Sequence, residues 1–418
     1  MLKKTALLLC FLGAAPMVYA NYLSNYGEPN TANLVNAINN RLLHVVQLGD
    51  SHTAGDTMTE ATRSRLQSVL GDGGMGWAMP MYFSGQRMAR FGYDNSNFTP
   101  ISSRSNSSEN YTLGGMIARP KANGASLTLK AKRTEVAQKI LVSIRQMAGD
   151  GRFVATDATG ARFAIETPYK NGAWQMVAIN AKLPLTLYNE GANHSAIGGW
   201  WAFNPNQQGA VVSALGINGA ELSHWNRWSE SAWQNELKTI NPQLIVIAYG
   251  TNEAYNGVDA QSVKNHLQWR VRQLRQHIPT AAIMIVGAPE ALKSTAGGCG
   301  TRPATLNAIQ QAQREVAQSE HTLYWDWQAA MGGSCSMKAW INSGKANRDG
   351  VHFSASGYGA LGTQLADDLL ALGSRGGYYH GYGAGHANQP SAPYVPASTP
   401  NVPSSTQGFI RIERANPQ

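Results

Sequence analysis

The chain has 418 residues and a formal net charge of +9 at pH 7. A chain of this length is longer than one hydrophobic core usually serves, so we expect a second domain and a tail. The positive charge favours a partner that is acidic on average, but no long run of Lys and Arg marks a binding stripe.

The first 20 residues have the pattern of a secretory signal peptide. Lys3 and Lys4 precede an apolar stretch over residues 6–15, and a small-residue cleavage site ends at Ala20. The stretch is shorter than the roughly 20 apolar residues that a transmembrane anchor needs, so we expect no anchor. We therefore predict an exported, periplasmic protein whose fold begins after residue 20.

Export also narrows the choice of partner and the chemistry of the cysteines. Without Lys3 and Lys4 the net charge falls from +9 to +7. This charge suits an anionic cell-wall polymer or an anionic lipid surface, whereas export argues against nucleic acid. The two cysteines that remain, Cys299 and Cys335, are expected to form a disulfide.

The chain after the signal peptide begins with a strand, a turn and a helix. Apolar residues at 44–48 predict a buried strand, and residues 57–70 show helical spacing. From residue 85 to 204 apolar residues instead alternate between turn signals, with strands expected at 126–132, 140–147, 153–156, 174–179 and 183–188. We interpret residues 85–204 as a β-sandwich inserted into the main domain.

Strands and helices then alternate again. Strands are expected at 211–217, 244–249, 283–287 and 321–325, and helices at 260–278, 303–318 and 356–372. This alternation predicts a mostly parallel sheet covered by helices on both faces, built from residues 21–84 and 205–373. Residues 374–418 are rich in Gly, Tyr, His, Pro and Ser, and we expect a disordered tail there.

The strongest local motif is Gly49-Asp50-Ser51-His52, between the first strand and the first helix. Open α/β sheets bind ligands at the carboxyl ends of their strands, and N–H groups at a helix start can stabilise an anion. Ser51 is therefore a candidate nucleophile, although a lone serine here also fits a helix cap. Asp50 and Asp56 are interpreted as turn and helix-start residues.

Asn252 follows the strand at 244–249, at the same edge of the predicted sheet. Its amide can hold the oxyanion of a tetrahedral intermediate, although a turn asparagine is the commoner case. Asp349 and His352 stand just before the last helix, where a lone histidine would be a surface residue. Together with Ser51, however, the histidine can take the serine proton while the carboxylate fixes its tautomer. The combination predicts a serine esterase.

These blocks resemble those of SGNH (GDSL-type) hydrolases over residues 44–70 and 208–372. The resemblance implies an SGNH-type three-layer α/β/α fold, with the β-sandwich as an insertion, and an enzyme that needs no cofactor. In that family a glycine between the first and third blocks lends its N–H to the oxyanion hole. Gly219 is the best match, and Gly216 is the alternative.

The implied oxyanion hole therefore comprises the N–H groups of Ser51 and Gly219 and the side-chain amide of Asn252. Glu253 stands where many family members have aspartate, and we expect little consequence because the donor is Asn252. His44, His52, His224 and His266 show no metal-ligand spacing on one helix face, so no metal is expected.

A narrower resemblance is to periplasmic peptidoglycan O-acetylesterases, whose first block reads Gly-Asp-Ser-His-Thr-Ala-Gly and whose hydrolase is interrupted by a β-rich, carbohydrate-binding-module-like domain. It implies a monomer that removes acetyl groups from MurNAc in acetylated peptidoglycan, or acts on another envelope glycan. An esterase or acetyltransferase for another polysaccharide, a lipid esterase or thioesterase, and a non-enzymatic wall-binding scaffold remain alternatives.

Five aromatic residues crowd the segment before the second block, and two interpretations are open for them. They can stack on a sugar ring of a substrate, or they can pack in the core, since aromatic side chains contribute large buried areas. The residues are Trp200, Trp201, Phe203, Trp225 and Trp228.

Overall fold

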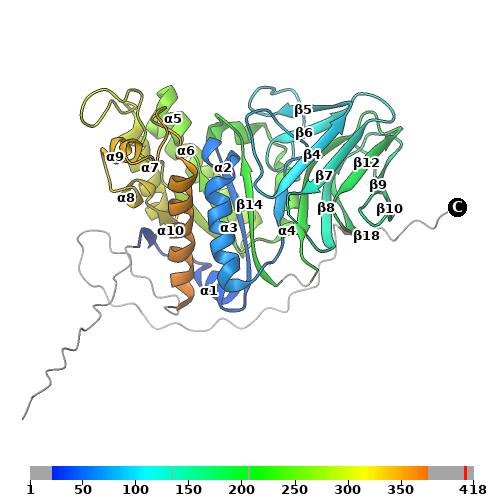
Figure 1. Ribbon diagram of the computed structural model, residues 1–418, viewed down its shortest axis with the longest axis horizontal. Helices are drawn as coiled ribbons and strands as arrows, with labels where there is room; N and C mark the ends of the chain where they lie inside the picture. Colours follow the sequence, from blue (N-terminus) through cyan, green and yellow to red (C-terminus); the bar gives the residue numbers. More distant parts are fainter. Residues whose placement is uncertain (1–20, 134, 206–207, 375–408, 412–418) are drawn as a thin grey trace, which may run out of the picture.

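The computed structural model describes residues 21–133, 135–205, 208–374 and 409–411. The predicted signal peptide, residues 1–20, lies outside the described residues, as does most of the expected tail. Figure 1 shows two parts side by side, one with helices around a sheet and one made mainly of strands. Among the described helices, none is long and apolar enough to cross a membrane.

The central sheet has six strands in the order β1, β17, β16, β15, β2, β14. The last five run parallel, and only the edge strand β1 is antiparallel to its neighbour. Strands β14 to β17 are buried along their whole length, as expected for parallel strands covered on both faces. The bounds are β1 Leu23–Asn25, β2 Leu42–Gly49, β14 Gly209–Gly216, β15 Leu244–Ala248, β16 Ala282–Val286 and β17 Leu323–Trp325.

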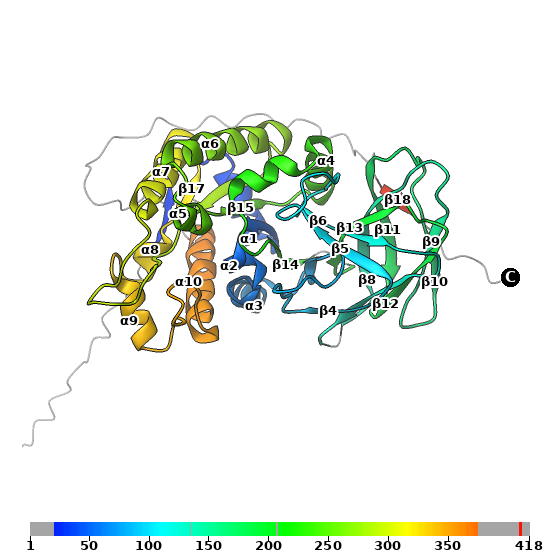
Figure 2. The same ribbon diagram turned by 90° about the horizontal axis from the view of Figure 1, so that it is seen from above.

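Helices cover both faces of this sheet (Figure 2). Leu244 and Val246 of β15 belong to the core that α1, α3 and α10 complete. Ile245 and Ile247 belong to the core on the opposite face, with α4, α6 and α7. Successive side chains of β15 thus point to opposite faces of the sheet, and each face packs against its own layer of helices. The bounds are α1 Thr31–Asn39, α3 Thr57–Leu70, α4 Glu230–Ile240, α6 Ala260–His277, α7 Leu306–Ser319 and α10 Ala355–Ser374.

Shorter helices occupy the loops of this part. The short helices are α2 Ser51–Ala54, η1 Leu222–Arg227, α5 Thr251–Asn256, α8 Trp327–Ala330 and α9 Ser336–Asn342. Helices α2, α5 and α8 directly follow β2, β15 and β17 at the carboxyl edge of the central sheet. They carry the candidate site residues Ser51 and Asn252 and the neighbouring Trp327.

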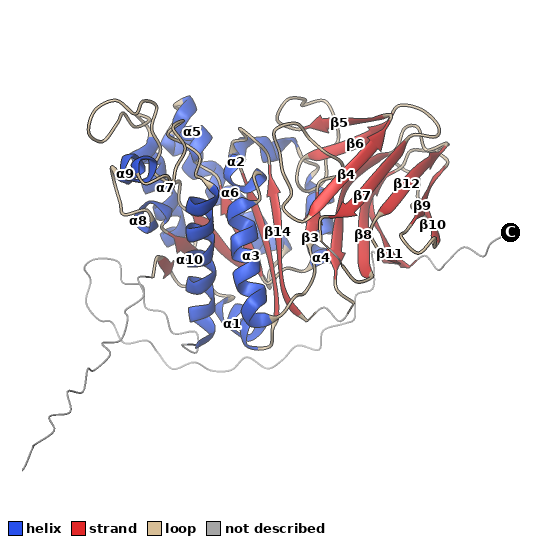
Figure 3. Cartoon of the chain, in the orientation of Figure 1, coloured by secondary structure: helices blue, strands red, loops and turns tan. Residues whose placement is uncertain are grey.

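Two further sheets form the second part of the molecule (Figure 3). One has the order β10, β9, β12, β7, β4; the other has the order β18, β11, β8, β13, β6, β5, with β3 paired to β13. Trp77 of β3 pairs with Trp201 of β13 and donates its backbone N–H to Ser213 of β14, so β3 links this part to the central sheet. The bounds are β3 Gly76–Ala78, β4 Phe91–Ser96, β5 Phe98–Ser102, β6 Met116–Pro120, β7 Ser126–Ala131, β8 Gln138–Arg145, β9 Arg152–Thr156, β10 Arg162–Ile165, β11 Trp174–Ala181, β12 Leu185–Glu190, β13 Ala196–Phe203 and β18 Phe409–Arg411.

The five aromatic residues before the second block pack in the core and do not face a substrate. Each has at most 8% of its surface exposed, and all five belong to one apolar cluster that spans both parts of the molecule. The sugar-stacking interpretation is therefore wrong for these residues. Their large side chains fill the junction between β13, η1 and α4.

The expectation of a disordered tail does not hold for Phe409–Arg411, and Ser374 still belongs to α10. Phe409–Arg411 form β18, which pairs in parallel with β11, where Met176 lies opposite Phe409. The physical reason is that β11 would be the edge of its sheet without β18. An edge strand presents unpaired backbone groups, and an extended segment can form hydrogen bonds with them.

Candidate active site

Three neighbouring strands of the central sheet end at the same level. The last residue of β2 lies opposite Gly216 of β14 and Ala248 of β15. The segments that follow these three strands carry Ser51, Gly219 and Asn252. Because the strands are parallel, the three segments leave the sheet at one edge, which is where open α/β sheets bind ligands.

Ser51 is the first residue of α2 and follows β2 through a tight turn. Asp50 forms the turn, with φ −92° and ψ −148°, and its Oδ1 accepts the His52 N–H at 3.0 Å. Gly216 approaches this turn so closely that a Cβ atom on it would lie 2.2 Å from the backbone nitrogen of Ala54. Close backbone packing therefore determines where the Ser51 hydroxyl lies.

The Ser51 hydroxyl lies next to the imidazole of His352. The Ser51 Oγ is 3.0 Å from His352 Nε2, and His352 Nδ1 is 2.8 Å from Asp349 Oδ2. Asp349 Oδ1 accepts the N–H groups of Val351 and His352, each at 2.9 Å. Partial burial raises the pKa of Asp349, but these hydrogen bonds outweigh burial, so the pKa is lowered overall. The ionised carboxylate can therefore orient the ring.

Gly219 lies in the turn after β14, and Asn252 is the second residue of α5. The Asn252 amide donates one hydrogen bond to the Ala220 carbonyl at 2.9 Å, and Gly219 has φ +69°, a conformation that favours glycine. Among the described residues, the N–H groups of Ser51 and Gly219 have no acceptor. These two N–H groups and the second amide hydrogen of Asn252 remain available to an anion.

Glu253, which differs from the usual aspartate, has a positioning role that the sequence did not indicate. Its two oxygens accept the N–H groups of Gly250 at 2.9 Å and Leu222 at 2.8 Å, which joins the Asn252 turn to η1. Burial raises the pKa of Glu253 to about 7, although the Leu222 N–H opposes this rise. Burial likewise raises the pKa of Asp50 to about 8.

His52, the residue after Ser51, supports the site without adding charge. Its Nδ1 lies 2.7 Å from the Tyr358 hydroxyl, and its ring centroid lies 5.5 Å from that of His352 and 5.1 Å from that of Trp327. Burial is the main cause that lowers the pKa of His52 to about 3, and the neighbouring His352 acts in the same direction. His52 is therefore a neutral packing partner of His352.

The turn at residues 349–352 is supported by a second loop, residues 288–302. Leu292 donates its N–H to the Gly350 carbonyl at 2.8 Å, and the Tyr255 hydroxyl donates to the Leu292 carbonyl. Phe353, directly after His352, is buried with its ring stacked on Trp327 at a centroid distance of 5.8 Å. These contacts hold the turn of His352 while the His352 side chain remains 40% exposed.

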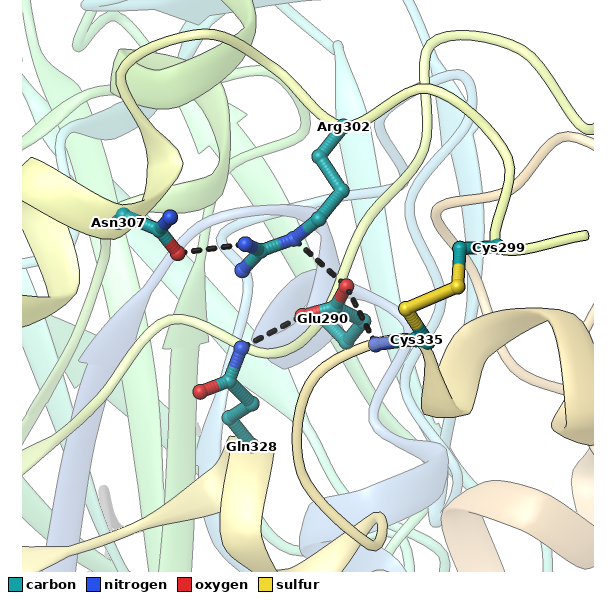
Figure 4. Close-up of a disulfide and its surroundings, with 6 residues drawn as sticks. All are labelled: Glu290, Cys299, Arg302, Asn307, Gln328 and Cys335. Carbon is teal, nitrogen blue, oxygen red and sulfur yellow. Dashed lines mark hydrogen bonds and ion pairs between the residues drawn. A yellow bond between two sulfur atoms is a disulfide. The ribbon is translucent and has the colours of Figure 1, made fainter.

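Figure 4 shows what holds the second loop itself. Cys299 and Cys335 form a disulfide, which confirms the predicted pairing. Beside it lies Glu290, fully buried, whose Oε1 pairs with Arg302 Nε at 2.6 Å. Glu290 also accepts the Gln328 amide at 2.6 Å and the Cys335 N–H at 3.3 Å. A covalent bond and a buried ion pair thus hold the loop together.

Within the part of the chain that the structure describes, no group of three or more His, Cys, Asp or Glu residues is arranged to hold a metal ion. His44 lies near the start of β2, at the end opposite Ser51, with its Nε2 3.0 Å from Ser213 Oγ. Burial lowers the pKa of His44 to about 3. Its role is therefore to pack as a neutral ring.

Comparison with known proteins places this site in a family. Residues 73–186 match the family described as peptidoglycan O-acetylesterase, N-terminal, and residues 187–360 match the GDSL-like lipase/acylhydrolase family. A solved peptidoglycan O-acetylesterase is 38% identical, with a TM-score of 0.77, and the match covers 85% of this chain and 99% of that one. The chain belongs to the peptidoglycan O-acetylesterase family.

Family membership confirms the predicted SGNH (GDSL-type) hydrolase and its chemistry as an esterase. More distant similarities include a lipase/acylhydrolase from Enterococcus faecalis, with 16% identity, a TM-score of 0.31, and 39% of this chain and 77% of that chain covered. A family two carbohydrate esterase from Cellvibrio japonicus has 13% identity and a TM-score of 0.29, with 68% and 98% covered. The comparison with curated proteins gives no match.

The structure adds residues to this peptidoglycan O-acetylesterase site that sequence reasoning missed. Glu290 follows β16 at the carboxyl edge of the sheet. Its place shortly after a predicted strand could have marked it as a candidate residue. Arg104 donates its Nε–H to the Gly219 carbonyl at 3.0 Å across 115 residues of sequence. No sequence signal marks Arg104, because only the fold brings it to Gly219.

Proposed function

We propose that this chain removes O-acetyl groups from the MurNAc units of peptidoglycan through an acetyl-enzyme on Ser51. The observation that carries the proposal is the contact chain from Ser51 Oγ through His352 to Asp349, with both distances at or below 3.0 Å, in a chain of this family. The net positive charge supports an anionic wall polymer as the partner.

In the proposed first half-reaction, the Ser51 oxygen attacks the acetyl carbonyl while His352 Nε2 takes the hydroxyl proton. Asp349 keeps the Nδ1 proton in place and stabilises the imidazolium. When the tetrahedral intermediate collapses, His352 returns the proton to the departing sugar oxygen. The products are a free sugar hydroxyl and an acetyl ester on Ser51.

In the second half-reaction, His352 takes a proton from water and the resulting hydroxide attacks the acetyl ester. As the tetrahedral intermediate collapses, His352 returns the proton to the Ser51 oxygen and acetic acid leaves, which then ionises to acetate in the solvent. In both tetrahedral intermediates the oxyanion accepts hydrogen bonds from the Ser51 N–H, the Gly219 N–H and the Asn252 amide. One donor of this kind typically lowers the free-energy barrier by about 3 to 4 kcal/mol.

The proposal includes the organisation of the chain. Residues 21–84 and 205–373 act as the hydrolase domain, and residues 85–204 form an inserted β-sandwich. The two sheets into which strands β4 to β13 assemble, with antiparallel neighbours, support this division. The protein acts as a monomer in the periplasm after cleavage of residues 1–20. Peptidoglycan as substrate supports that location, because the polymer lies outside the cytoplasmic membrane.

Acetate release from O-acetylated peptidoglycan tests the proposal. The mature protein should release acetate from this polymer and from a short-chain aryl acetate, and Ser51→Ala should abolish both. Asn252→Ala should lower kcat by about 10²–10³ on either substrate. Cleavage of the aryl ester without any release from the wall polymer would contradict the substrate, and activity in Ser51→Ala would contradict the mechanism.

A further inference from the structure

The turn after β5 brings a cation from the strand-rich part of the molecule to the active site. Arg104 lies in this turn, and its guanidinium packs directly on Gly219. Its Nε–H bonds to the Gly219 carbonyl at 3.0 Å, and a Cβ atom on Gly219 would lie 2.8 Å from two guanidinium nitrogens. The residue proposed as an oxyanion donor is thus in contact with a positive charge from a different part of the chain.

The backbone of Arg104 is held by residues around η1. Arg227 Nη1 donates to the Ser103 carbonyl at 2.5 Å and to the Arg104 carbonyl at 2.8 Å. The Trp228 indole N–H donates to the Ser103 hydroxyl at 3.1 Å, with Trp228 itself buried. These bonds fix the turn against the hydrolase, so the guanidinium is presented from a defined position.

The guanidinium of Arg104 has no acidic partner among the described residues. Some other arginines of the strand-rich part are paired with acids, for example Arg90 with Glu60 and Arg119 with Glu109. Arg104 is exposed, and one of its five N–H donors bonds to Gly219 while the other four have no acceptor in the described chain. Its charge reaches the surroundings: burial lowers the pKa of His224, and the positive charge of Arg104 adds to that lowering.

We propose that Arg104 binds a carboxylate of the wall substrate beside the reacting ester and thereby selects acetylated peptidoglycan over neutral acetylated polysaccharides. This inference rests on the proposed function. A planar guanidinium with a free edge suits bidentate binding of a carboxylate. Peptidoglycan carries carboxylates on its stem peptides, whereas the acetyl group and the sugar ring are neutral. The strand-rich part thus contributes directly to specificity.

The test compares Arg104→Gln with the wild type on three substrates. These are soluble O-acetylated peptidoglycan fragments, the same fragments after their carboxylates are converted to neutral methyl amides, and an aryl acetate. We expect kcat/KM to fall on the order of tenfold on the anionic fragments, mainly through KM, as is typical for the loss of a charged hydrogen bond. On the other two substrates any loss reports only the contact between Arg104 and Gly219, and it should be at least threefold smaller than the loss on the anionic fragments.

Two matched variants complete the design. Arg104→Lys keeps the charge and should recover part of the affinity for the anionic fragments. Arg162→Gln removes an exposed arginine on β10, an edge strand of the five-stranded sheet, and should change none of the three activities.

Three outcomes would overturn the inference: an equal loss with Arg104→Gln on the aryl acetate, an equal loss on the amidated fragments, or no loss on any substrate. An equal loss on all three substrates would mean that Arg104 only positions Gly219, and an equal loss on the two kinds of fragment alone would mean that it binds a neutral part of the substrate. Release of acetate by the wild type and its loss in Ser51→Ala would leave the proposed function standing in each case. If the wild type released no acetate from either fragment, the proposed function itself would fail.

Discussion

The proposed nucleophile, Ser51, and its proposed base, His352, are held by supports of different construction. Ser51 follows a buried central strand, and its turn is fixed by backbone atoms of α2 packed against Gly216. Asp349 and His352 belong to one turn, and their side chains are 46% and 40% exposed. This turn contacts the loop 288–302, which a disulfide links to Cys335. Two residues that act together can thus be held in different ways: the Ser51 turn by packing on the central sheet, and the turn at 349–352 by a loop that is fixed by a disulfide.

The strongest disruption of the base side should come from Asp349→Asn. The amide keeps the size of the carboxylate but no longer holds the required tautomer of His352, so kcat should fall by about 10⁴. Kinetics on an aryl acetate measure this. The control is Asp367→Asn, since Asp367 is similarly exposed and pairs with Arg65 on the surface. A loss below tenfold in Asp349→Asn would mean that the carboxylate does not orient the base.

Removal of the disulfide should weaken the support of the base side. Replacing Cys299 and Cys335 by serine opens a link between residues 36 positions apart. The free energy of unfolding should drop by about 3 to 4 kcal/mol, because the bond restricts the conformational freedom of the unfolded chain. Denaturant unfolding measures the change.

Reduction of the wild type provides the control for the disulfide. A reducing agent should lower the stability of the wild type to that of the double serine variant and leave the variant unchanged. A difference below about 1 kcal/mol would show that the contacts of Glu290 hold the loop without the covalent bond.

The support of Ser51 should be sensitive to a change at Gly216. In Gly216→Ala the new Cβ atom would meet backbone atoms of Ala54 and Asp50 at 2.2 and 2.7 Å. Overpacking of this kind costs about 1 to 3 kcal/mol, and a displaced Ser51 should lower kcat by about 10². Thermal unfolding and kinetics test both effects. Gly55→Ala is the control, because its nearest neighbour lies at 3.5 Å, and unchanged behaviour of Gly216→Ala would contradict the packing argument.

A third support, between the two parts of the molecule, should respond to pH. Glu236 of α4 is buried and accepts hydrogen bonds from Thr112, from Ser143 at 3.1 Å and from the Trp201 indole at 2.8 Å. Burial raises its pKa from 4.5 to about 6, although these hydrogen bonds oppose the rise. Between these values the unfolded state has released its proton and the folded state keeps it.

The free energy of unfolding should therefore fall by about 2 kcal/mol through this group as the pH rises from 4.5 to above 6. Glu236→Gln should remove this part of the slope, so the variant gains stability relative to the wild type over that interval. Denaturant unfolding at several pH values measures it. Parallel curves for the two proteins would show that Glu236 is ionised in the fold throughout.

The amino-acid sequence alone determined the elements with strong periodicity and the position of the candidate site residues. Ser51, Asn252 and the turn at 349–352 follow predicted strands or precede a predicted helix, and the carboxyl ends of parallel strands must share an edge. Local pattern therefore sufficed for these residues, because their placement depends only on the sheet being parallel. The disulfide followed from the number of cysteines and the expected export.

Only the tertiary structure decided the contacts that cross the chain. The sequence did not predict β13, because Gly198 and Gly199 interrupt its apolar pattern, and its tryptophans then looked available to a sugar. The approach of Arg104 to Gly219 and the buried position of Glu236 depend on how the strand-rich part packs on the central sheet. Such packing is set by shape and burial among residues far apart in sequence, which no local pattern records.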